Sequence, residues 1–298
     1  MRHAFRSLCK SPGFTVVALL ALALGIGANT AIFSVVYGVV LRPLPYPEQH
    51  RLLFIGEWSQ QVPNMSVSYP NFTDWRERQR AFTALGAFRF HGVNYVGPTE
   101  SERLTGIMAS HDLFAALAVP PLLGRVFSGD EDKPGAERTV LVSERLWRRL
   151  FAGRADALGE KLQLNGDFYT VVGVMPADFQ FPAASVDVWL PLGLFADGYQ
   201  ERRNHPGLYC VARLKPGVSY EAGVADIKGI AEQLAREYPA TNAHQSAAVQ
   251  PLADRAFGRV RPALFVLLGA AGFVLLIACA NVANLQLARA HGRAREFA

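Results

Sequence analysis

Long uncharged apolar runs lie near both ends of the chain, and alternating apolar and polar positions fill the part between them. The first run spans residues 14–40 and the second spans residues 263–285. A hydrocarbon core of about 30 Å needs roughly 20 apolar residues as a helix, so both runs predict transmembrane helices. The first run extends to about 40 Å as a helix, which predicts a span that continues outside the membrane as a stalk.

The segment between the two runs has the pattern of short strands mixed with amphipathic helices. Short apolar runs and alternation of apolar and polar residues predict strands at 52–55, 88–96, 103–108, 139–142, 161–164, 168–174, 186–190, 208–214 and 247–252. Helical spacing predicts helices at 74–79, 111–117, 144–151 and 220–238. Asn165 and Gly166 form a two-residue turn signal between two strands, which indicates a hairpin. We therefore predict an α+β domain of two lobes.

These patterns divide the chain into five parts. We expect a basic cytoplasmic or interfacial segment at 1–13, a transmembrane helix with its stalk at 14–40, and an extracytoplasmic domain at 41–261. A second transmembrane helix follows at 262–288, and a cytoplasmic tail at 289–298. The predicted fold class is a membrane protein in which two transmembrane α-helices bracket an α+β domain.

The distribution of charge excludes the partner that the overall charge first suggests. A net charge of +5 and a pI near 9.2 are compatible with nucleic-acid binding. The whole excess, however, lies in the two outer flanks, and residues 14–285 are neutral overall. The flanking basic residues are Arg2, Arg6, Lys10, Arg289, Arg293 and Arg295. Basic flanks of this kind follow the positive-inside rule, so we expect a lipid bilayer and no nucleic acid.

A cleaved signal peptide is the alternative interpretation of the N-terminal run. Arg2, Arg6 and Lys10 would form its basic region, and Ala21-Leu22-Ala23 resembles a cleavage site. The run is long for a signal peptide, and the second run places both basic flanks on one side of the membrane. These two features favour a retained anchor, although long loops weaken the positive-inside rule.

Small and amide residues in the two runs are the candidate helix-packing site. Residues of this kind at four-residue spacing let helix backbones approach closely, and buried amides in lipid face other helices or a cavity. The candidates are Ala21, Gly25, Gly27, Ala28 and Asn29 in the first run, and Asn281 and Asn284 in the second. Asn29 and Asn284 are expected at different depths in the membrane. Further helices are therefore the expected partners of Asn281 and Asn284. The alternative is an ordinary anchor whose glycines have no packing role.

Residue patterns typical of enzymes are missing from the sequence. The histidines have no His or Cys neighbour at metal-ligand spacing, and no Gly-x-Ser-x-Gly motif occurs. The segment 153–161 has one residue too many for a phosphate-binding loop. The acidic turn at 129–133 is expected to be a solvated loop rather than a calcium site. Cys9, Cys210 and Cys279 fall in three different parts of the chain, so we expect no disulfide, no catalytic residue, and no metal or cofactor site.

Several motifs resemble those of one family, the MacB/FtsX-type permeases of ABC transporters. The N-terminal motifs are Ser11-Pro-Gly-Phe14-Thr, Leu24-Gly-Ile-Gly-Ala-Asn-Thr-Ala-Ile-Phe33 and Val40-Leu-Arg-Pro-Leu-Pro-Tyr-Pro47. The segment between the runs resembles the MacB-like periplasmic core domain through Ser68-Tyr-Pro-Asn-Phe72, Asp74-Trp75, Gly124-Arg125 and Gly166-Asp-Phe-Tyr-Thr-Val-Val-Gly-Val-Met-Pro176. The second run, with Leu276-Ile-Ala-Cys-Ala-Asn-Val-Ala-Asn-Leu285, is similar to the start of an FtsX-like permease domain. Among such proteins the chain is most similar to the duplicated orphan permeases of acidobacteria.

The resemblance implies a multi-pass protein of the bacterial inner membrane with a large periplasmic domain. A cytoplasmic ABC ATPase subunit would bind ATP, and its closure would move the first helix and thereby the periplasmic domain. The expected partners are that ATPase, a permease homodimer or second permease, and a periplasmic accessory protein or cargo. Family members continue past the Arg295-Glu296 pair into further spans, so we expect the chain ending at Ala298 to be truncated.

Two functions of other classes remain as alternatives. A membrane-tethered extracytoplasmic binding or sensor module without transport fits the same two spans and the same domain. Its discriminating observation is stable function without an ATPase partner. An exported enzyme is the weaker alternative, because the sequence contains no catalytic constellation.

Overall fold

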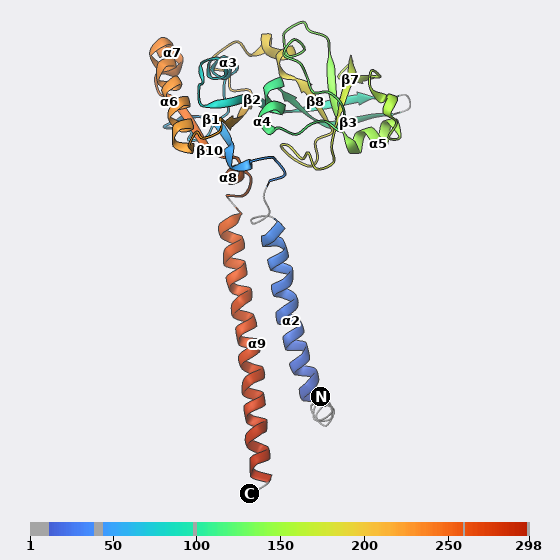
Figure 1. Ribbon diagram of the computed structural model, residues 1–298, viewed down its shortest axis with the longest axis vertical. Helices are drawn as coiled ribbons and strands as arrows, with labels where there is room; N and C mark the ends of the chain where they lie inside the picture. Colours follow the sequence, from blue (N-terminus) through green and yellow to red (C-terminus); the bar gives the residue numbers. More distant parts are fainter. Residues whose placement is uncertain (1–11, 39–43, 98–99, 259, 297–298) are drawn as a thin grey trace. The chain divides into compact units, whose positions relative to one another are not determined.

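The computed structural model describes residues 12–38, 44–97, 100–258 and 260–296 (Figure 1). The chain forms two units, one made of residues 1–43 with 256–298 and the other made of residues 44–255. The first unit contains two long helices. The second unit is an α+β domain, which agrees with the predicted class.

The strands of the α+β domain form one sheet in the order β10-β1-β9-β2-β3-β8-β5-β7-β4, with β6 bonded to both β2 and β7. The strands are β1 (Leu52–Ser59), β2 (Phe82–Val96), β3 (Ser101–Ala109), β4 (Leu123–Gly124), β5 (Thr139–Ser143), β6 (Lys161–Leu164), β7 (Asp167–Met175), β8 (Val188–Pro191), β9 (Tyr209–Leu214) and β10 (Gln245–Pro251). The two predicted lobes are therefore two regions of a single sheet, and one strand belongs to both.

That shared strand is β2, which changes its partners along its 15 residues. Its first half pairs with β9 between Phe82 and Phe88, and its second half pairs with β3 between Phe88 and Val96. The sequence predicts only the second half, because the first half is buried on both faces and lacks regular alternation. The register shift between Phe82 and Ala84 marks a bulge in that half.

The region of the sheet that contains the second half of β2 closes on itself as a ring of six strands. The pairs β2-β3, β3-β8, β8-β5, β5-β7, β7-β6 and β6-β2 return to the starting strand, with Tyr95 opposite Leu164 at the closing point. Inward side chains alternate with outward ones on each strand. Those turned inward form one apolar cluster that includes Val93, Leu104, Val142, Leu164 and Val188.

The other region of the sheet, made of β10, β1, β9 and the first half of β2, is open, and helices cover both of its faces (Figure 1). On one face lie α3 (Tyr69–Arg78) and α6 (Tyr220–Glu237), whose apolar residues pack with those of β1 and β9. On the other face lies α4 (His111–Leu117). Gly86 of β2 permits this contact, because a Cβ there would lie 2.2 Å from the Leu113 backbone nitrogen. Shorter elements are α5 (Glu144–Phe151), α7 (Pro239–Asn242), α8 (Leu252–Phe257) and the 3-10 helices η2 (Gln49–Arg51), η3 (Ala155–Ala157) and η4 (Leu192–Tyr199).

Local signals set most of the helix and hairpin boundaries. Ser143 caps α5 as predicted, because its side-chain oxygen accepts a hydrogen bond from the Leu146 nitrogen. The helix predicted at 74–79 begins earlier, at Tyr69, where Ser68 is the cap and Pro70 lies in the first turn. The predicted β6–β7 hairpin is confirmed, with positive φ angles of 52° at Asn165 and 94° at Gly166.

The helical unit consists of α2 (Pro12–Val36) and α9 (Arg261–Glu296), which lie side by side (Figure 1). Residues 261–284 of α9 are long and apolar enough to cross a membrane. The comparable stretch of α2, Ala23–Val36, is shorter. The predicted basic segment up to residue 11 lies outside the described residues, as do residues 39–43 of the predicted stalk and its exit and residues 297–298 of the tail.

Candidate functional site

The α2–α9 pair contains every residue of the predicted helix-packing site. Half-buried and buried side chains on α2 recur at Gly25, Asn29, Ile32 and Val36, which form one face. On α9, half-buried and buried side chains recur every seven residues in two interleaved series. The first series is Leu264, Ala271 and Ala278, and the second is Leu268, Leu275 and Val282. An average spacing of 3.5 residues is typical of left-handed helix pairs.

Gly25 and Asn29 are the two predicted residues that meet α9. The Asn29 side-chain nitrogen donates to the Ala271 carbonyl oxygen and to the Gly25 carbonyl oxygen, both at 2.9 Å. A Cβ at Gly25 would lie 3.2 Å from Leu275 Cδ1 and 3.6 Å from Ala278 Cβ. Glycine at this position thus allows the close approach that brings the Asn29 amide to a carbonyl on the neighbouring helix.

Four of the other predicted packing residues lie away from this contact. Nothing approaches within 4 Å of a Cβ placed on Gly27, and Ala28 is exposed. Asn281 and Asn284 are also exposed, so the structure does not bring them to Asn29. The Ala21 side chain lies outside the described residues. Packing of these residues against further helices stays a prediction.

The acceptor for Asn29 is a residue that the sequence does not single out. Ala271 belongs to the small-residue segment Gly269-Ala-Ala-Gly272. This run of small residues is the one sequence feature that indicates a close helix contact here. The acceptor itself cannot be predicted from sequence, because every residue has a backbone carbonyl.

A buried polar network connects β1 with α3 in the α+β domain. The Glu57 side chain is 1% exposed, and its Oε1 accepts hydrogen bonds from the Ser68 nitrogen at 2.9 Å and from Asn71 Nδ2 at 2.8 Å. Glu57 Oε2 has no hydrogen-bond partner, and His205 Nδ1 lies 3.7 Å from it. Burial raises the pKa of Glu57, against the hydrogen bonds from Ser68 and Asn71 that lower it.

The same network continues to the surface through Arg202. Its guanidinium donates to Asn71 Oδ1 and to Asp74 Oδ2, both at 2.6 Å, and lies 3.7 Å from the centroid of the Tyr238 ring. Arg78 pairs with Asp74 on one side and with Glu237 on the other. These contacts tie α3, the 200–207 loop and the end of α6 together, which is a structural role.

The acidic turn at 129–133 is not a fully solvated loop, contrary to the sequence-based expectation. The Asp132 side chain is 3% exposed and accepts hydrogen bonds from the His111 backbone nitrogen and the Gly193 nitrogen. His111 Nδ1 lies 3.1 Å from Asp132 Oδ2, and this hydrogen bond raises the pKa of His111. The turn thereby links α4 to η4. Among the described residues, no group of three or more His, Cys, Asp or Glu side chains is arranged to hold a metal ion.

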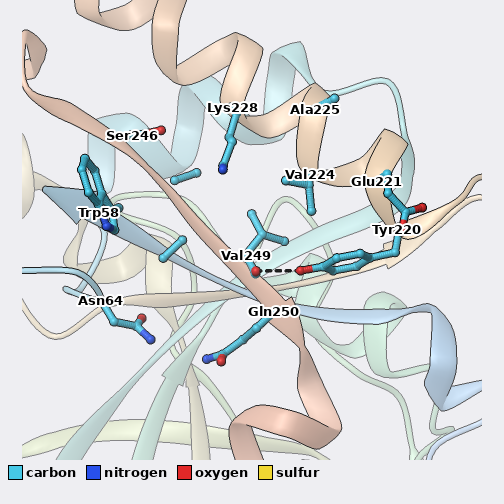
Figure 2. A pocket seen from close by; sticks show the side chains of 12 residues that line it. Trp58, Asn64, Tyr220, Glu221, Val224, Ala225, Lys228, Ser246, Val249 and Gln250 are labelled. Carbon is cyan, nitrogen blue, oxygen red and sulfur yellow. Dashed lines mark hydrogen bonds between the residues drawn. The ribbon is translucent and has the colours of Figure 1, made fainter.

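A groove of about 700 Å³ lies between α6 and β10 (Figure 2). Trp58, Tyr220 and Val224 supply apolar surface, while Glu221 and Lys228 supply the charged groups. The Tyr220 hydroxyl donates to the Val249 carbonyl oxygen at 3.0 Å. No sequence motif marks these residues, because the groove joins segments that are distant in the chain.

Comparison with known proteins identifies a matching family and solved structures of similar fold. Residues 15–230 match the family described as MacB-like periplasmic core domain. A permease-protein domain from Porphyromonas gingivalis has a TM-score of 0.55 and 16% identity, over 70% of this chain and 93% of that one. The periplasmic region of MacB from Actinobacillus actinomycetemcomitans has a TM-score of 0.52 and 12% identity, over 77% of this chain and 97% of that one. No curated protein matches the chain at a significant level.

Proposed function

Because the chain belongs to the family of the MacB-like periplasmic core domain, we propose that it is the permease subunit of an ABC transporter. It contains the periplasmic domain of a MacB-like permease. In the proposed mechanism, ATP hydrolysis by a cytoplasmic partner moves this domain relative to its cargo or accessory protein.

The proposal depends on one observation: the domain that matches the family is joined directly, along the chain, to an apolar helix. The family match begins at residue 15, inside α2, and includes the domain up to α6. At the other end of the domain, α9 supplies a 24-residue candidate span from Arg261 to Asn284. We propose that α2 and α9 both cross the inner membrane, so that residues 44–255 lie in the periplasm.

Contacts between the two helices support a mechanical role for them. The hydrogen bond from Asn29 to Ala271 and the close approach at Gly25 hold α2 against α9. A displacement of either helix on the cytoplasmic side would therefore be passed to both chain segments that enter the domain. ATP would bind to the partner ATPase, and the second permease copy or a related permease would complete the transporter.

Reporter fusions test the topology on which this function depends. A reporter fused after Gly135, in an exposed loop, is expected to be active only on the periplasmic side. A reporter at Ala298 is expected to be active only in the cytoplasm. The reverse pattern, or activity of both fusions on one side, would refute the proposed topology.

Capture of the ATPase tests the coupling itself. The tagged full chain is purified from its native membranes with ATP and vanadate, and in parallel without nucleotide. We expect an ABC ATPase subunit to copurify, with a larger yield in the trapped sample. A stable, periplasmically active chain that retains no ATPase under either condition would support the membrane-tethered binding or sensor module instead.

A further inference from the structure

β10 is an edge strand, and its outer side is open. It stands at one end of the strand order and pairs only with β1 among the described strands. Edge strands present unpaired backbone groups that can bond to another strand. Natural edges are often protected by proline or charge, and here Pro251 lies only at the end of the strand.

The backbone groups that face outward can be assigned from the neighbouring contacts. Glu57 of β1 exchanges hydrogen bonds with Met65, on the side of β1 that faces β9. In antiparallel pairing these directions alternate, so Gly56 and Trp58 bond to Ala248 and Ser246 of β10. The N–H and C=O groups of Gln245, Ala247 and Val249 therefore point outward.

One of the outward groups already has a partner within the chain. The Val249 carbonyl oxygen accepts the hydrogen bond from the Tyr220 hydroxyl. For Ala247, the part of the chain that the structure describes offers no backbone hydrogen bond beyond the ladder. A carbonyl oxygen has two lone pairs, so Val249 can still accept a second hydrogen bond.

The rim of α6 beside this edge has charges of both signs. Glu221 and Lys228 are exposed and line the groove, and Val224 and Ala225 lie between them (Figure 2). Seven residues correspond to two helical turns, so Glu221 and Lys228 lie on one face about 10 Å apart along the helix axis.

We propose that a second copy of this chain docks on this edge, so that the two sheets join through antiparallel β10 strands. A two-fold axis would pass beside Ala248 of β10 and between Val224 and Ala225 of α6. Ala247 of each copy would then exchange backbone hydrogen bonds with Val249 of the second copy. The α6 helices would run antiparallel across the axis and fill each other's groove with small apolar side chains.

The charges on α6 favour a second copy over a foreign strand. An isologous interface must be complementary to itself. With the axis between Val224 and Ala225, Glu221 of each copy faces Lys228 of the other, which gives two opposite-charge pairs. Alanine at 248 also lets the strands meet closely at the axis, because directly opposed residues of a non-hydrogen-bonded pair have Cα atoms about 4.5 Å apart.

This interface locates a contact of the permease dimer, but it does not depend on coupling to an ATPase. Two copies can join through β10 whether or not ATP is hydrolysed. Failure of the ATPase capture therefore leaves the β10 interface standing, and failure of the β10 test leaves the coupling mechanism standing.

Disulfide crosslinking of the full chain in membranes tests the interface. Cys9 and Cys279 are first replaced by serine, while Cys210 is kept because it is fully buried. We expect Ala248→Cys to form a disulfide dimer under oxidising conditions, since a Cα separation of about 4.5 Å is within disulfide range. Gln250→Cys is the matched control on the same strand and face. Its two copies would lie about 14 Å apart, so we expect at least about tenfold less dimer from it.

Charge reversal in the Ala248→Cys background tests the choice of occupant. Glu221→Lys and Lys228→Glu are each expected to lower the disulfide yield about threefold, because each puts like charges opposite one another. The double variant restores the opposite pairs and is expected to recover the yield. A folded Ala248→Cys chain that stays monomeric would overturn the proposal. So would equal dimer yields from Ala248→Cys and Gln250→Cys, or a disulfide between Ala248→Cys and a different protein.

Discussion

At the scale of single residues, Glu57 differs from the other carboxylates of the domain because it is buried and only one of its two oxygens accepts hydrogen bonds. Two hydrogen bonds reach Oε1, whereas Oε2 has none. A buried charge without a partner costs free energy, and the group responds by holding a proton more tightly. The raised pKa of Glu57 thus follows from its place on the buried side of β1.

We expect Glu57 to make the stability of the domain pH-dependent. Its pKa lies above the ordinary value of 4.5 in the folded chain, so the folded state holds a proton that the unfolded state has lost. The contribution to stability is complete below pH 4.5 and is lost as pH rises through the folded pKa. Glu57→Gln removes this titration while keeping an oxygen for Ser68 and Asn71. Thermal unfolding of both proteins across this range is the measurement.

Glu232→Gln is the matched control, because that side chain is exposed on α6. It is expected to retain the wild-type pH dependence. The interpretation fails if Glu57→Gln unfolds with the same dependence on pH as the wild type, since another group would then be responsible for the titration.

At the scale of elements, the pairing of α2 with α9 depends on which face of α2 carries each glycine. Gly25 lies at the contact, where a Cβ would meet Leu275 and Ala278. Gly27 is two residues away and therefore points in a different direction, into open space. The sequence shows both glycines as members of small-residue stripes and does not distinguish between them.

We expect Gly25→Leu to separate the two helices and Gly27→Leu to leave them paired. A leucine at 25 clashes with Leu275 and Ala278 of α9 and holds the helices apart, which weakens their association by about 1 kcal/mol. The reporter is the disulfide between Asn29→Cys and Ala271→Cys, whose native side chain and carbonyl are 2.9 Å apart. Its yield should fall several-fold with leucine at 25. Equal yields with leucine at 25 and at 27 would contradict the assigned face.

At the scale of the whole molecule, the closed ring of strands stabilises one end of the α+β domain. Leu164 closes the ring opposite Tyr95 and is fully buried in the apolar cluster inside it. Removal of a buried leucine side chain leaves a cavity that neighbouring strands cannot fill without breaking the ring.

Leu164→Ala is therefore expected to lower the free energy of unfolding by about 2–5 kcal/mol. Leu122→Ala makes the same chemical change at a side chain that is 48% exposed, so its effect should stay within about 0.5 kcal/mol. Denaturant unfolding followed by tryptophan fluorescence measures both. Similar losses for the two variants would argue against the ring as a packed core.

How much of this architecture is predictable depends on how far apart the interacting residues lie in the chain. The apolar runs, the Ser143 cap and the Asn165-Gly166 turn are local signals, and the structure contains the corresponding helices and hairpin. The family motifs are also contiguous in sequence, and the match over residues 15–230 confirms the resemblance to the MacB-like periplasmic core domain. The buried position of Asp132 is not predictable, since its partners His111 and Gly193 come from distant segments.

The sequence by itself determined the kind of protein: an α+β domain of the MacB-like family between two apolar helices with basic outer flanks. Side-chain periodicity and turn chemistry are properties of neighbouring residues, so they can be read along the chain. Only the tertiary structure decided that β2 serves two sheet regions, that Tyr95 meets Leu164, that Asn29 bonds to Ala271, and that β10 is left as an open edge. Each of these joins segments far apart in sequence, and their pairing is set by the burial that the folded chain achieves as a whole.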